Sequence, residues 1–384
     1  MLIAMSVVGA AHYYVWARLV FAPALAPGLY WALSALLFAL WLSIPGTFVL
    51  SRRAPRPVAA FVVWFGYAWL GSIFLLFVSV LAADVLRALW AGLSWLLGDE
   101  ASTSELVRNR RWAAGTATVA GLMLLGSLWT ARRVVVKRVE VPLSKLPASL
   151  HGTTIVQLSD VHIGPTLGRR FLSRVVAAAN ALEPDVVAIT GDLVDGSVAR
   201  LSEAVEPLGS LRARHGVFFV TGNHEYYSGA DAWCAHLTGL GIRVLRNERV
   251  SVGNADASYD LAGIDDFTAH HFGAGHGADL KRALEGRDPK RELVLLAHQP
   301  RAVVEAERAG VGLQISGHTH GGQIWPFNFL VRLQQPVTAG LNRFGRALIY
   351  VSSGTGYWGP PMRLGSRAEI TQLVLLAPEG AAAE

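Results

Sequence analysis

Three long stretches near the beginning of the chain contain no charged side chain. They cover residues 25–50, 58–83 and 112–131, and the shortest of them is 20 residues long. A helix needs about 20 apolar residues, at about 1.5 Å each, to cross the hydrocarbon core of a bilayer. Because that core offers no water to unpaired backbone groups, each stretch is predicted to cross the membrane as a helix.

Two further segments of the first third are apolar but carry ionisable residues. Residues 2–21 include His12 and Arg18 and lack the basic start and small-residue cleavage site of a signal peptide, so we expect a retained fourth span. Residues 85–98 include an arginine and are too short to cross, so we expect an interfacial turn or an extension of the preceding helix. The sequence therefore predicts a membrane region over 1–131 with about four helices.

Charge is distributed unevenly between this region and the rest of the chain. Residues 1–131 contain 8 of the 34 basic residues, 4 of the 28 acidic residues and 9 of the 12 tryptophans. The remainder has a net charge near +2, which gives no support for a nucleic-acid partner. Cys234 is the only cysteine, which excludes an internal disulfide bond and a cysteine metal cluster.

The basic residues beside the spans predict the orientation of the chain. Arg52, Arg53 and Arg56 lie in the turn between two spans, and Arg132 and Arg133 follow the last span. With four spans these two groups lie on the same side, which the positive-inside rule makes cytoplasmic. Three arginines in the loop between the last two spans favour the opposite orientation. We expect a multi-pass protein of the cell membrane whose soluble part faces the cytoplasm.

From residue 134 onward, short apolar runs alternate with helical stretches. The expected strands are 154–159, 185–190, 216–221, 259–263, 292–297, 313–316, 347–352 and 370–376. The expected helices are 169–182, 197–213, 231–240 and 301–309. Such alternation predicts an α/β domain with largely parallel sheets, whose chemistry lies at the carboxyl ends of the strands. We place a linker and an initial strand at 132–150 and the α/β domain at 151–384.

Polar side chains that can bind metals follow five of these strands. The segments are Ser159-Asp160-Val161-His162, Gly191-Asp192-Leu193-Val194-Asp195, Gly222-Asn223-His224-Glu225, Ala297-His298-Gln299-Pro300 and Gly317-His318-Thr319-His320-Gly321-Gly322. Each is common as a surface pair or a turn, but their joint occurrence in this order indicates a site. Carboxylate, imidazole and amide ligands without thiolate suit Mn²⁺, Fe or Zn²⁺, and their number exceeds the needs of one ion. Two metal ions are therefore predicted.

In these segments the sequence resembles the calcineurin-like metallophosphoesterase superfamily, whose signature is D-x-H, G-D-x-x-D, G-N-H-E, a lone histidine and G-H-x-H. The resemblance covers residues 134–376. The hydrophobic anchor and the Gly-His-Thr-His-Gly-Gly-Gln segment further resemble its bacterial membrane-anchored branch, which is related to UDP-2,3-diacylglucosamine hydrolases. The resemblance implies a four-layer αββα sandwich around two divalent metal ions. We expect Mn²⁺, with Fe or Zn²⁺ as alternatives.

The resemblance also implies a role for each motif residue. The ligands of the first metal would be Asp160, His162 and His320, and those of the second Asn223, His298 and His318, with Asp192 bridging both. His224 follows a ligand without being one, and it is the expected proton donor to the leaving oxygen. Asp195 is expected to orient His224 and hold its proton. Gly191, Gly222 and Gly317 precede ligands, where we expect a crowded backbone.

These parts predict a metal-dependent phosphoester hydrolase. Two cations about 3.5 to 4 Å apart neutralise the phosphate oxygens and lower the pKa of a bridging water, and the resulting hydroxide attacks in line. Protein serine/threonine phosphatases have an arginine after the residue equivalent to Asp195, where this chain has Gly196, and the near-neutral soluble part offers no basic track for a nuclease. We expect a phosphodiester or pyrophosphate bond in a lipid-linked or nucleotide-linked substrate. A phosphomonoesterase is the alternative.

Several features leave alternatives open. The ionisable residues at or near the spans also fit a transporter or sensor whose membrane bundle is coupled to a phosphoesterase domain. The glycine-rich loop with His270, His271 and His276 is either a solvated surface loop or a cap beside the site. The aromatic segment 325–330 fits core packing as well as an acyl-chain groove or contact with the bilayer. Arg363 is a candidate phosphate contact, and the sequence indicates no oligomeric state.

Overall fold

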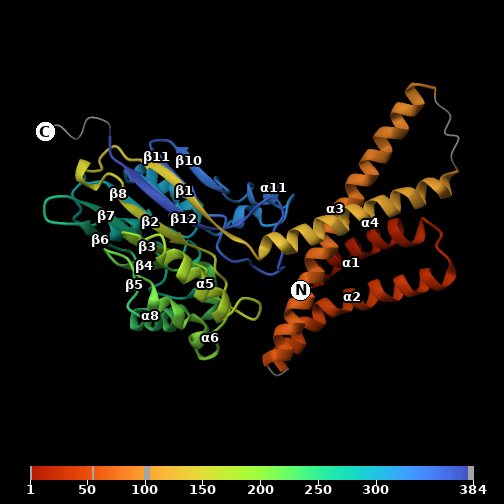
Figure 1. Ribbon diagram of the computed structural model, residues 1–384, viewed down its shortest axis with the longest axis horizontal. Coiled ribbons are helices and arrows are strands. Elements are labelled where there is room, and N and C mark those ends of the chain that lie inside the picture. The colour runs from red at the N-terminus through yellow and green to blue at the C-terminus, as the bar shows by residue number, and fades with distance from the viewer. Residues whose placement is uncertain (1, 54–55, 99–103, 379–384) are drawn as a thin grey trace. The chain divides into compact units, whose positions relative to one another are not determined.

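The computed structural model describes residues 2–53, 56–98 and 104–378. Outside the described residues lie positions 54 and 55 of the predicted basic turn, positions 99–103 and positions 379–384 of the predicted α/β domain. The chain forms two compact units, drawn together in Figure 1. The helical unit comprises Met1–Trp129 and Gly359–Met362, and the α/β unit comprises Thr130–Trp358 and Arg363–Glu384.

The helices of the helical unit follow the apolar stretches of the sequence. They are α1 Leu2–Trp16, α2 Pro27–Arg53, α3 Arg56–Leu96 and α4 Glu105–Ala131. The helices long and apolar enough to cross a membrane cover Pro27–Thr47, Val58–Leu96 and Glu105–Ala131. The described residues therefore contain three candidate spans. Because α3 continues to Leu96, the segment 85–98 extends this helix and forms no separate interfacial turn.

Helix α1 is shorter than the fourth span that we expected. Its 15 regular residues pass into a wider, π-helical turn over Ala17–Phe21, so the segment 2–21 is helical and a fourth span over it stays a prediction. On its buried side, Val15 packs against Ile73 and Val80 of α3. Packing against α3 thus covers only part of the apolar surface of α1, because Ile3, Val7 and Tyr13 remain 82%, 64% and 69% exposed.

Three ionisable residues of this unit, Arg18, Asp84 and Arg87, pair with one another. The Arg18 guanidinium lies 2.8 Å from the Asp84 carboxylate, and Arg87 lies 3.9 Å from the same carboxylate. Charges near the membrane are normally accommodated by such pairing. The presence of these residues therefore does not require a transported ion.

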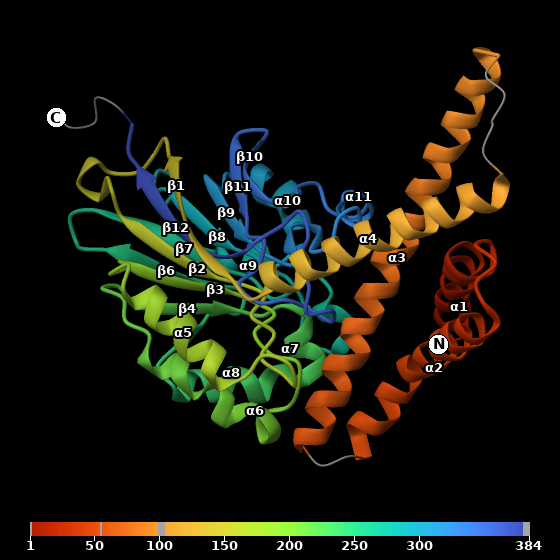
Figure 2. The same cartoon turned by 45° about the vertical axis from the view of Figure 1, so that its right-hand side comes forward.

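The α/β unit contains two six-stranded sheets (Figures 1 and 2). The first sheet, in spatial order, consists of β1 Val134–Pro142, β12 Ala368–Leu376, β2 Thr154–Leu158, β3 Val186–Thr190, β4 Val217–Val220 and β5 Arg243–Val244. The second consists of β10 Gly340–Phe344, β11 Ala347–Val351, β9 Leu313–Ser316, β8 Leu293–Leu296, β7 Ser258–Gly263 and β6 Glu248–Gly253. Strands β2 to β5 are mutually parallel, as are β7, β8, β9 and β11.

Three hydrophobic cores hold these layers together. Alternating side chains point to opposite faces of a strand, so Ile155 of β2 packs between the two sheets, whereas Val156 packs against helices. The helices over the first sheet are α5 Arg169–Asn180, α6 Val198–Val205 and α8 Ala230–Gly239. Those over the second are α9 Leu280–Ala283 and α10 Val303–Arg308. The arrangement is the expected four-layer αββα sandwich.

The structure corrects the helix predicted over 197–213. Helix α6 ends at Val205, and a single 3₁₀ turn covers Glu206–Ser210. Pro207 has no backbone N–H to continue the helix, and its ring clashes with the preceding turn. The apolar spacing alone therefore overestimated the length of this helix.

Three strands were not predicted from the sequence pattern. β5, β6 and β10 lie at sheet edges and are partly exposed along their length. An edge strand with solvent on more than one side has no clear apolar run, which removes the signal used for the central strands.

Candidate metal centre

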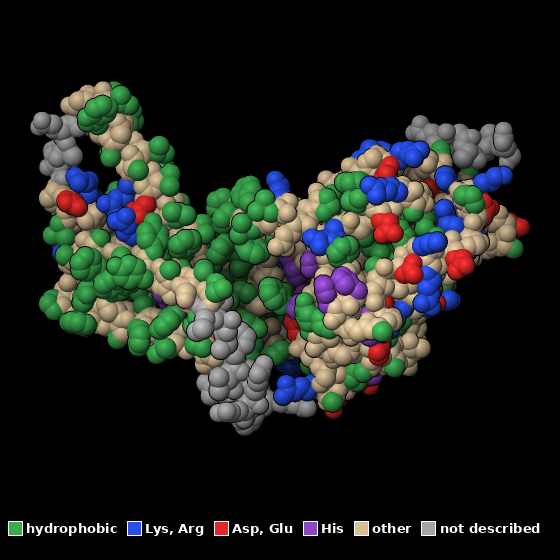
Figure 3. Space-filling view, turned by 180° about the vertical axis from the view of Figure 1, so that it is seen from behind, with side chains coloured by type: hydrophobic (Ala, Val, Ile, Leu, Met, Phe, Trp, Pro, Cys, Tyr) green, Lys and Arg blue, Asp and Glu red, His purple; other side chains and the backbone are tan. Residues whose placement is uncertain are grey.

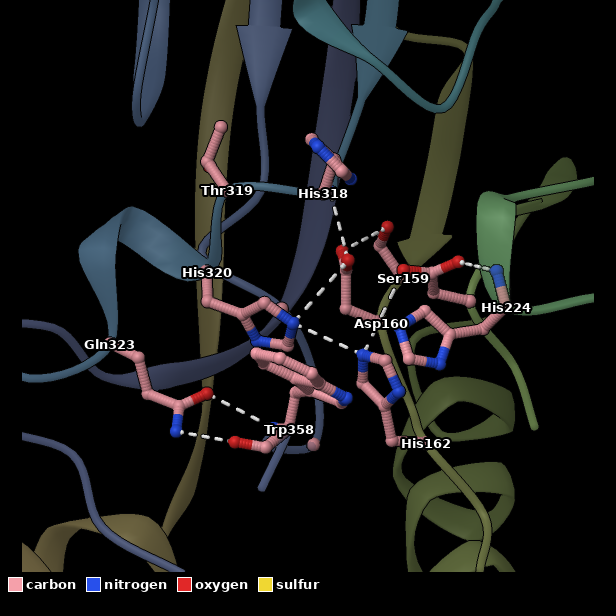
Figure 4. Close-up of polar contacts among 12 residues, drawn as sticks. Ser159, Asp160, His162, His224, His318, Thr319, His320, Gln323 and Trp358 are labelled. Atoms are coloured by element: carbon pink, nitrogen blue, oxygen red, sulfur yellow. Dashed lines mark hydrogen bonds and ion pairs between the residues drawn. The ribbon is translucent and has the colours of Figure 1, made fainter. Parts of the chain in front are cut away.

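The predicted metal-binding segments meet at one edge of the sandwich. They follow β2, β3 and β4 in the first sheet and β8 and β9 in the second, because the parallel strands of both sheets end there. Figure 4 shows Asp160, His162, His224 and His320 close together, from the loops that follow β2, β4 and β9. Two groups of these side chains, together with a third that contains Asp195, have ligand atoms close enough to hold an ion.

The backbone at five of the predicted ligands has left-handed conformation. The φ angle is +51° at Asp160, His162, Asp192 and His320 and +71° at His318. Residues other than glycine rarely adopt it, at a cost of about 1–3 kcal/mol each. The loops are locked by hydrogen bonds to one another, since the Asp160 N–H donates to the Gly191 carbonyl and the His162 N–H to the Asp192 carbonyl, both at 3.1 Å. The turns thereby aim the side chains inward.

The first group joins Asp160, His162 and His320, which are all buried. His162 Nε2 lies 3.1 Å from His320 Nε2, and His320 Nε2 lies 3.7 Å from Asp160 Oδ1. Asp160 Oδ2 accepts a hydrogen bond of 2.6 Å from Ser159 Oγ. The three ligand atoms therefore surround a common point.

The second group joins Asp192, His298 and His318. Asp192 Oδ2 lies 3.1 Å from His298 Nε2, and His318 Nδ1 lies 3.2 Å from the same nitrogen. The Asp192 oxygen is also 3.9 Å from His162 Nε2, which belongs to the first group. One carboxylate thus faces both groups, as a bridging ligand must.

The other ring nitrogens fix the ligand atoms. His298 Nδ1 lies 2.8 Å from the Thr190 carbonyl, which only accepts, so this nitrogen carries a proton and Nε2 is the ring nitrogen that faces Asp192. His162 Nδ1 likewise donates to Asp195 Oδ1 at 3.0 Å. Metal-binding histidines usually donate their second N–H to a carbonyl or a carboxylate. The site therefore presents two ring nitrogens, His298 Nε2 and His162 Nε2, toward the Asp192 carboxylate.

The charges in the second group favour the binding of a cation. Burial lowers the pKa of His298, but the charge of Asp192 outweighs it and raises that pKa well above its usual value. Burial and the neighbouring His298 lower the pKa of His318 to about 3, so this imidazole stays neutral and keeps its lone pair. A buried carboxylate that attracts positive charge, next to a neutral imidazole, fits a bound metal ion.

Asn223, the predicted amide ligand, is the first residue of α7 Asn223–Ser228. Its Oδ1 is buried and has no hydrogen-bond partner in the described part of the chain. Buried polar oxygens normally have a partner, and leaving one without costs about 1–3 kcal/mol. The orphaned oxygen is therefore the position where a metal would complete the site.

His224 and Asp195 lie beside the two groups. Asp195 Oδ1 accepts from His224 Nδ1 at 2.6 Å as well as from His162, so one carboxylate orients both imidazoles. Burial raises the pKa of Asp195, but the two histidines outweigh it and hold that pKa below its usual value. Burial lowers the pKa of His224, but Asp192 and Asp195 raise it to about 9. His224 is therefore protonated at neutral pH.

Glu225 is a site residue to which the sequence assigned no role. Its fully buried carboxylate accepts hydrogen bonds from the backbone N–H groups of Asp192 at 2.9 Å, Leu193 at 2.8 Å and Gly222 at 2.7 Å. It thereby ties the loop after β3 to the loop after β4. Its place after His224 in the Gly-Asn-His-Glu segment was the available signal.

The crowding expected at the motif glycines is present. A Cβ at Gly317 would overlap Ser159 Oγ and Asp160 Oδ2, and one at Gly222 would overlap Asp192 Oδ1. Any larger residue would displace a predicted ligand. These glycines therefore allow the loops to approach.

Aromatic side chains border the centre next to His224. The rings of Tyr227 and Trp358 lie 5.3 and 5.8 Å from the His224 ring and are 64% and 55% exposed. Gln323 fixes Trp358 through two backbone hydrogen bonds, accepting from its N–H at 3.0 Å and donating to its carbonyl at 2.9 Å. Figure 3 shows hydrophobic side chains beside the histidines on this face. Sequence motifs alone did not indicate this border.

The remaining candidates have different positions. Phe272, in the loop with His270 and His271, contacts Tyr227 with rings 5.5 Å apart, so this loop reaches the aromatic border as a cap would. Arg363 is fully buried and donates to backbone carbonyls, including that of Gly356 at 2.6 Å, so it is not exposed to a substrate phosphate. The predicted phosphate contact at Arg363 is therefore wrong for this structure.

The aromatic segment 325–330 is not a core segment. Trp325, Phe329 and Leu330 are 46%, 54% and 55% exposed. The sequence left core packing, an acyl-chain groove and contact with the bilayer as alternatives for this segment. Core packing does not fit these exposed side chains.

Known proteins resemble this chain over most of its length. The profile of the family described as calcineurin-like phosphoesterase matches residues 153–322. A "transmembrane protein with metallophosphoesterase domain" from Bos taurus is 43% identical over 327 residues, which cover 81% of this chain and 73% of that protein. The protein of the same name from Danio rerio is 43% identical over 291 residues, 73% of this chain and 67% of the relative. An uncharacterized metallophosphoesterase from Helicobacter pylori is 38% identical over 262 residues, 66% of this chain and 69% of the relative.

Proposed function

Because this chain belongs to the calcineurin-like phosphoesterases and is a membrane-anchored, metal-dependent phosphoester hydrolase, we propose that it cleaves a phosphodiester or pyrophosphate bond of a lipid-linked or nucleotide-linked substrate. The observation that carries the proposal is the position of Asp192 Oδ2, 3.1 Å from His298 Nε2 and 3.9 Å from His162 Nε2. A carboxylate shared in this way suits two metal ions acting on one phosphorus.

We assign the ligands as the geometry suggests. The first ion would be held by Asp160, His162 and His320, the second by Asn223, His298 and His318, and both by Asp192. When bound, the two ions neutralise the phosphoryl oxygens and supply a hydroxide nucleophile near neutral pH. The mixed carboxylate, imidazole and amide donors favour Mn²⁺, with Fe or Zn²⁺ as alternatives.

The protein's own part in the chemistry is proton transfer and orientation. His224 is protonated at neutral pH and lies at the edge of the centre, so it protonates the departing oxygen. Asp195 holds its Nδ1 proton at 2.6 Å and thereby points Nε2 toward the leaving group. Asp195 also orients His162, which couples the position of the acid to that of a ligand.

The surroundings of His224 support an apolar or ring-bearing leaving group. Tyr227 and Trp358 both lie beside the proton donor, His224, and more than half of each side chain is exposed. Arg301 lies over the Phe267 ring at 4.9 Å. Burial and the charge of His298 are the larger causes that lower the pKa of His318, and the charge of Arg301 lowers it further, so Arg301 is a cation in the surroundings of the second group. A second phosphate of a pyrophosphate substrate would find a charge partner there.

The substrate class is tested with the full chain in lipid nanodiscs containing Mn²⁺. We expect kcat/KM for bis-p-nitrophenyl phosphate and for a nucleotide-linked lipid pyrophosphate to exceed that for p-nitrophenyl phosphate. EDTA should abolish hydrolysis, and added metal should restore it. Preference for the monoester would make the protein a phosphomonoesterase, and activity that survives complete chelation would refute the metal mechanism.

We further propose that the α/β unit faces the cytoplasm. Helices α3 and α4 separate the Arg52, Arg53 and Arg56 turn from Arg132 and Arg133, so the two groups emerge on the same side whether or not α1 crosses. A cytoplasm-specific reporter fused after Glu384 should be active, and the same reporter fused after Gly98 should be silent. The reverse pattern would place the catalytic site outside the cell.

A further inference from the structure

A surface loop after the Gly-His-Thr-His segment exposes several large hydrophobic side chains. Trp325, Phe329, Leu330 and Leu333 are 46%, 54%, 55% and 81% exposed, and α11 Asn328–Val331 forms the single helical turn between them. We call residues 325–333 the apolar loop; α11 is labelled in Figure 1. Apolar side chains gathered in this way on a soluble surface mark a contact with a partner or a membrane.

The apolar loop is held by its own backbone and by the body of the α/β unit. The Trp325 N–H donates to the Leu364 carbonyl at 2.8 Å, and the Leu330 N–H donates to the Phe327 carbonyl at 3.0 Å. At its far end Gln335 is buried and accepts from the Arg301 N–H at 3.1 Å. The exposed side chains therefore project from a fixed turn.

The sequence around the loop carries only positive charge. Residues 308–368 contain six arginines and neither aspartate, glutamate nor lysine, although the part of the chain after residue 131 has a net charge near +2. Arg332 and Arg343 are exposed, and the Arg332 guanidinium lies 5.9 Å from the Phe329 ring centre. An exposed arginine next to exposed apolar side chains matches a surface of lipid tails under anionic headgroups, and Arg343 adds an exposed positive charge on β10.

Chain connectivity keeps this surface near a bilayer. Candidate span α4 ends at Ala131 and β1 begins at Val134, so only Arg132 and Arg133 join them. Two residues reach about 7 Å when fully extended. The α/β unit is therefore tethered within reach of the membrane surface.

We propose that the apolar loop docks onto the anionic lipid bilayer in which the chain is anchored. Phe329, Leu330 and Leu333 enter the headgroup region, and Arg332 and Arg343 bind lipid phosphates. The loop begins five residues after His320, so docking holds the metal centre beside the membrane. The consequence that a lipid-linked substrate is taken directly from the bilayer rests on the proposed function, whereas the docking itself does not.

The docking is tested by an environment-sensitive fluorophore on Leu330→Cys in the full chain. The chain is placed in nanodiscs of phosphatidylcholine and phosphatidylglycerol, with and without doxyl-labelled lipid. Burial raises the pKa of the native Cys234 thiol to about 12, so it competes little for the label, and unsubstituted protein checks this. Val304→Cys, at a 43% exposed position in α10, is the matched control.

We expect blue-shifted emission and doxyl quenching at position 330, and neither at position 304. Removing phosphatidylglycerol should weaken both effects, because the arginines then lose their partners. An unshifted, unquenched label at 330 would overturn the docking. Equal quenching at both positions would show that no particular loop inserts, and would overturn it as well.

A variant that introduces negative charge into the apolar loop links the docking to turnover. Leu330→Glu with Leu333→Glu should leave hydrolysis of water-soluble bis-p-nitrophenyl phosphate unchanged and raise KM for a lipid-embedded phosphodiester by roughly tenfold, since carboxylates are repelled from the bilayer. Equal losses on both substrates would instead indicate damage to the fold and contradict the assigned role. Absence of phosphoesterase activity in every variant, with the fluorophore still inserted, would refute the proposed function and leave the docking supported.

Discussion

Replacing Asp192 with alanine is expected to remove both metal ions and to lower hydrolysis by at least about 10³-fold, because metal ions supply several kcal/mol of transition-state stabilisation and each 1.36 kcal/mol is tenfold in rate. Asp192 Oδ2 lies between His298 of one group and His162 of the other. The loss of one side chain therefore disrupts both groups. Elemental analysis of purified full-length protein should fall from close to two metals per chain to close to none.

Two control variants make this result specific. His162→Ala removes a ligand of the first group only, so it should lose mainly one ion. Asp231→Ala removes an aspartate whose side chain is 71% exposed on α8, and it should keep both. Wild-type metal content in Asp192→Ala would contradict the bridging assignment.

Replacing His224 with alanine is expected to lower turnover by roughly 10² to 10⁴-fold for a substrate with a poor alkoxide leaving group. Metal content should remain near that of the unsubstituted protein, because His224 Nδ1 donates to Asp195 and the residue belongs to neither of the two groups assigned as ligands. A p-nitrophenolate leaving group needs little protonation, so the loss of turnover on a p-nitrophenyl substrate should be distinctly smaller. Asp195→Asn should follow the same leaving-group dependence.

The pH dependence of turnover is an independent test of His224 as the proton donor. Asp192 and Asp195 outweigh burial and raise the pKa of His224 to about 9, so the protonated donor is present below that pH and is lost as the pH rises through it. Cations bound at Asp192 lower the pKa of His224 and therefore move the basic limb of the pH–rate profile to lower pH. Turnover of the poor-leaving-group substrate should fall along a basic limb that is absent in His224→Ala. Metal loss in His224→Ala, or equal losses for both leaving groups, would assign the histidine to positioning instead.

Much of the site could be predicted because the ligand motifs coincide with the ends of apolar runs. Parallel strands finish at the same edge of a sheet, so Asp160 and His298 meet although they are far apart in the sequence. Glu225 could not be assigned a role, since its partners are backbone N–H groups of another loop, which no residue pattern reveals. The double use of Asp195 was hidden for the same reason, because its second partner is a ligand that the motif treats separately.

Element boundaries were less predictable than element types. The edge strands β5, β6 and β10 lack a continuous apolar run, and Pro207 shortened a helix whose apolar spacing continued past it. In the helical unit the regular part of the predicted span 2–21 ends at Trp16, and a π-helical turn continues it to Phe21. Amino-acid composition does not predict where the backbone hydrogen-bonding pattern of a helix changes.

Because loops from both sheets meet at one edge, metal binding is expected to affect the stability and the abundance of the protein in the cell. Strands β2, β3 and β4 belong to one sheet and β8 and β9 to the other, so ions held as proposed act as a cross-link between the two halves of the sandwich. A ligand that binds only the folded chain stabilises it in proportion to the logarithm of its free concentration. Metal starvation would therefore shorten the half-life of the protein as well as slow its turnover, and its abundance would follow metal supply without any change in transcription.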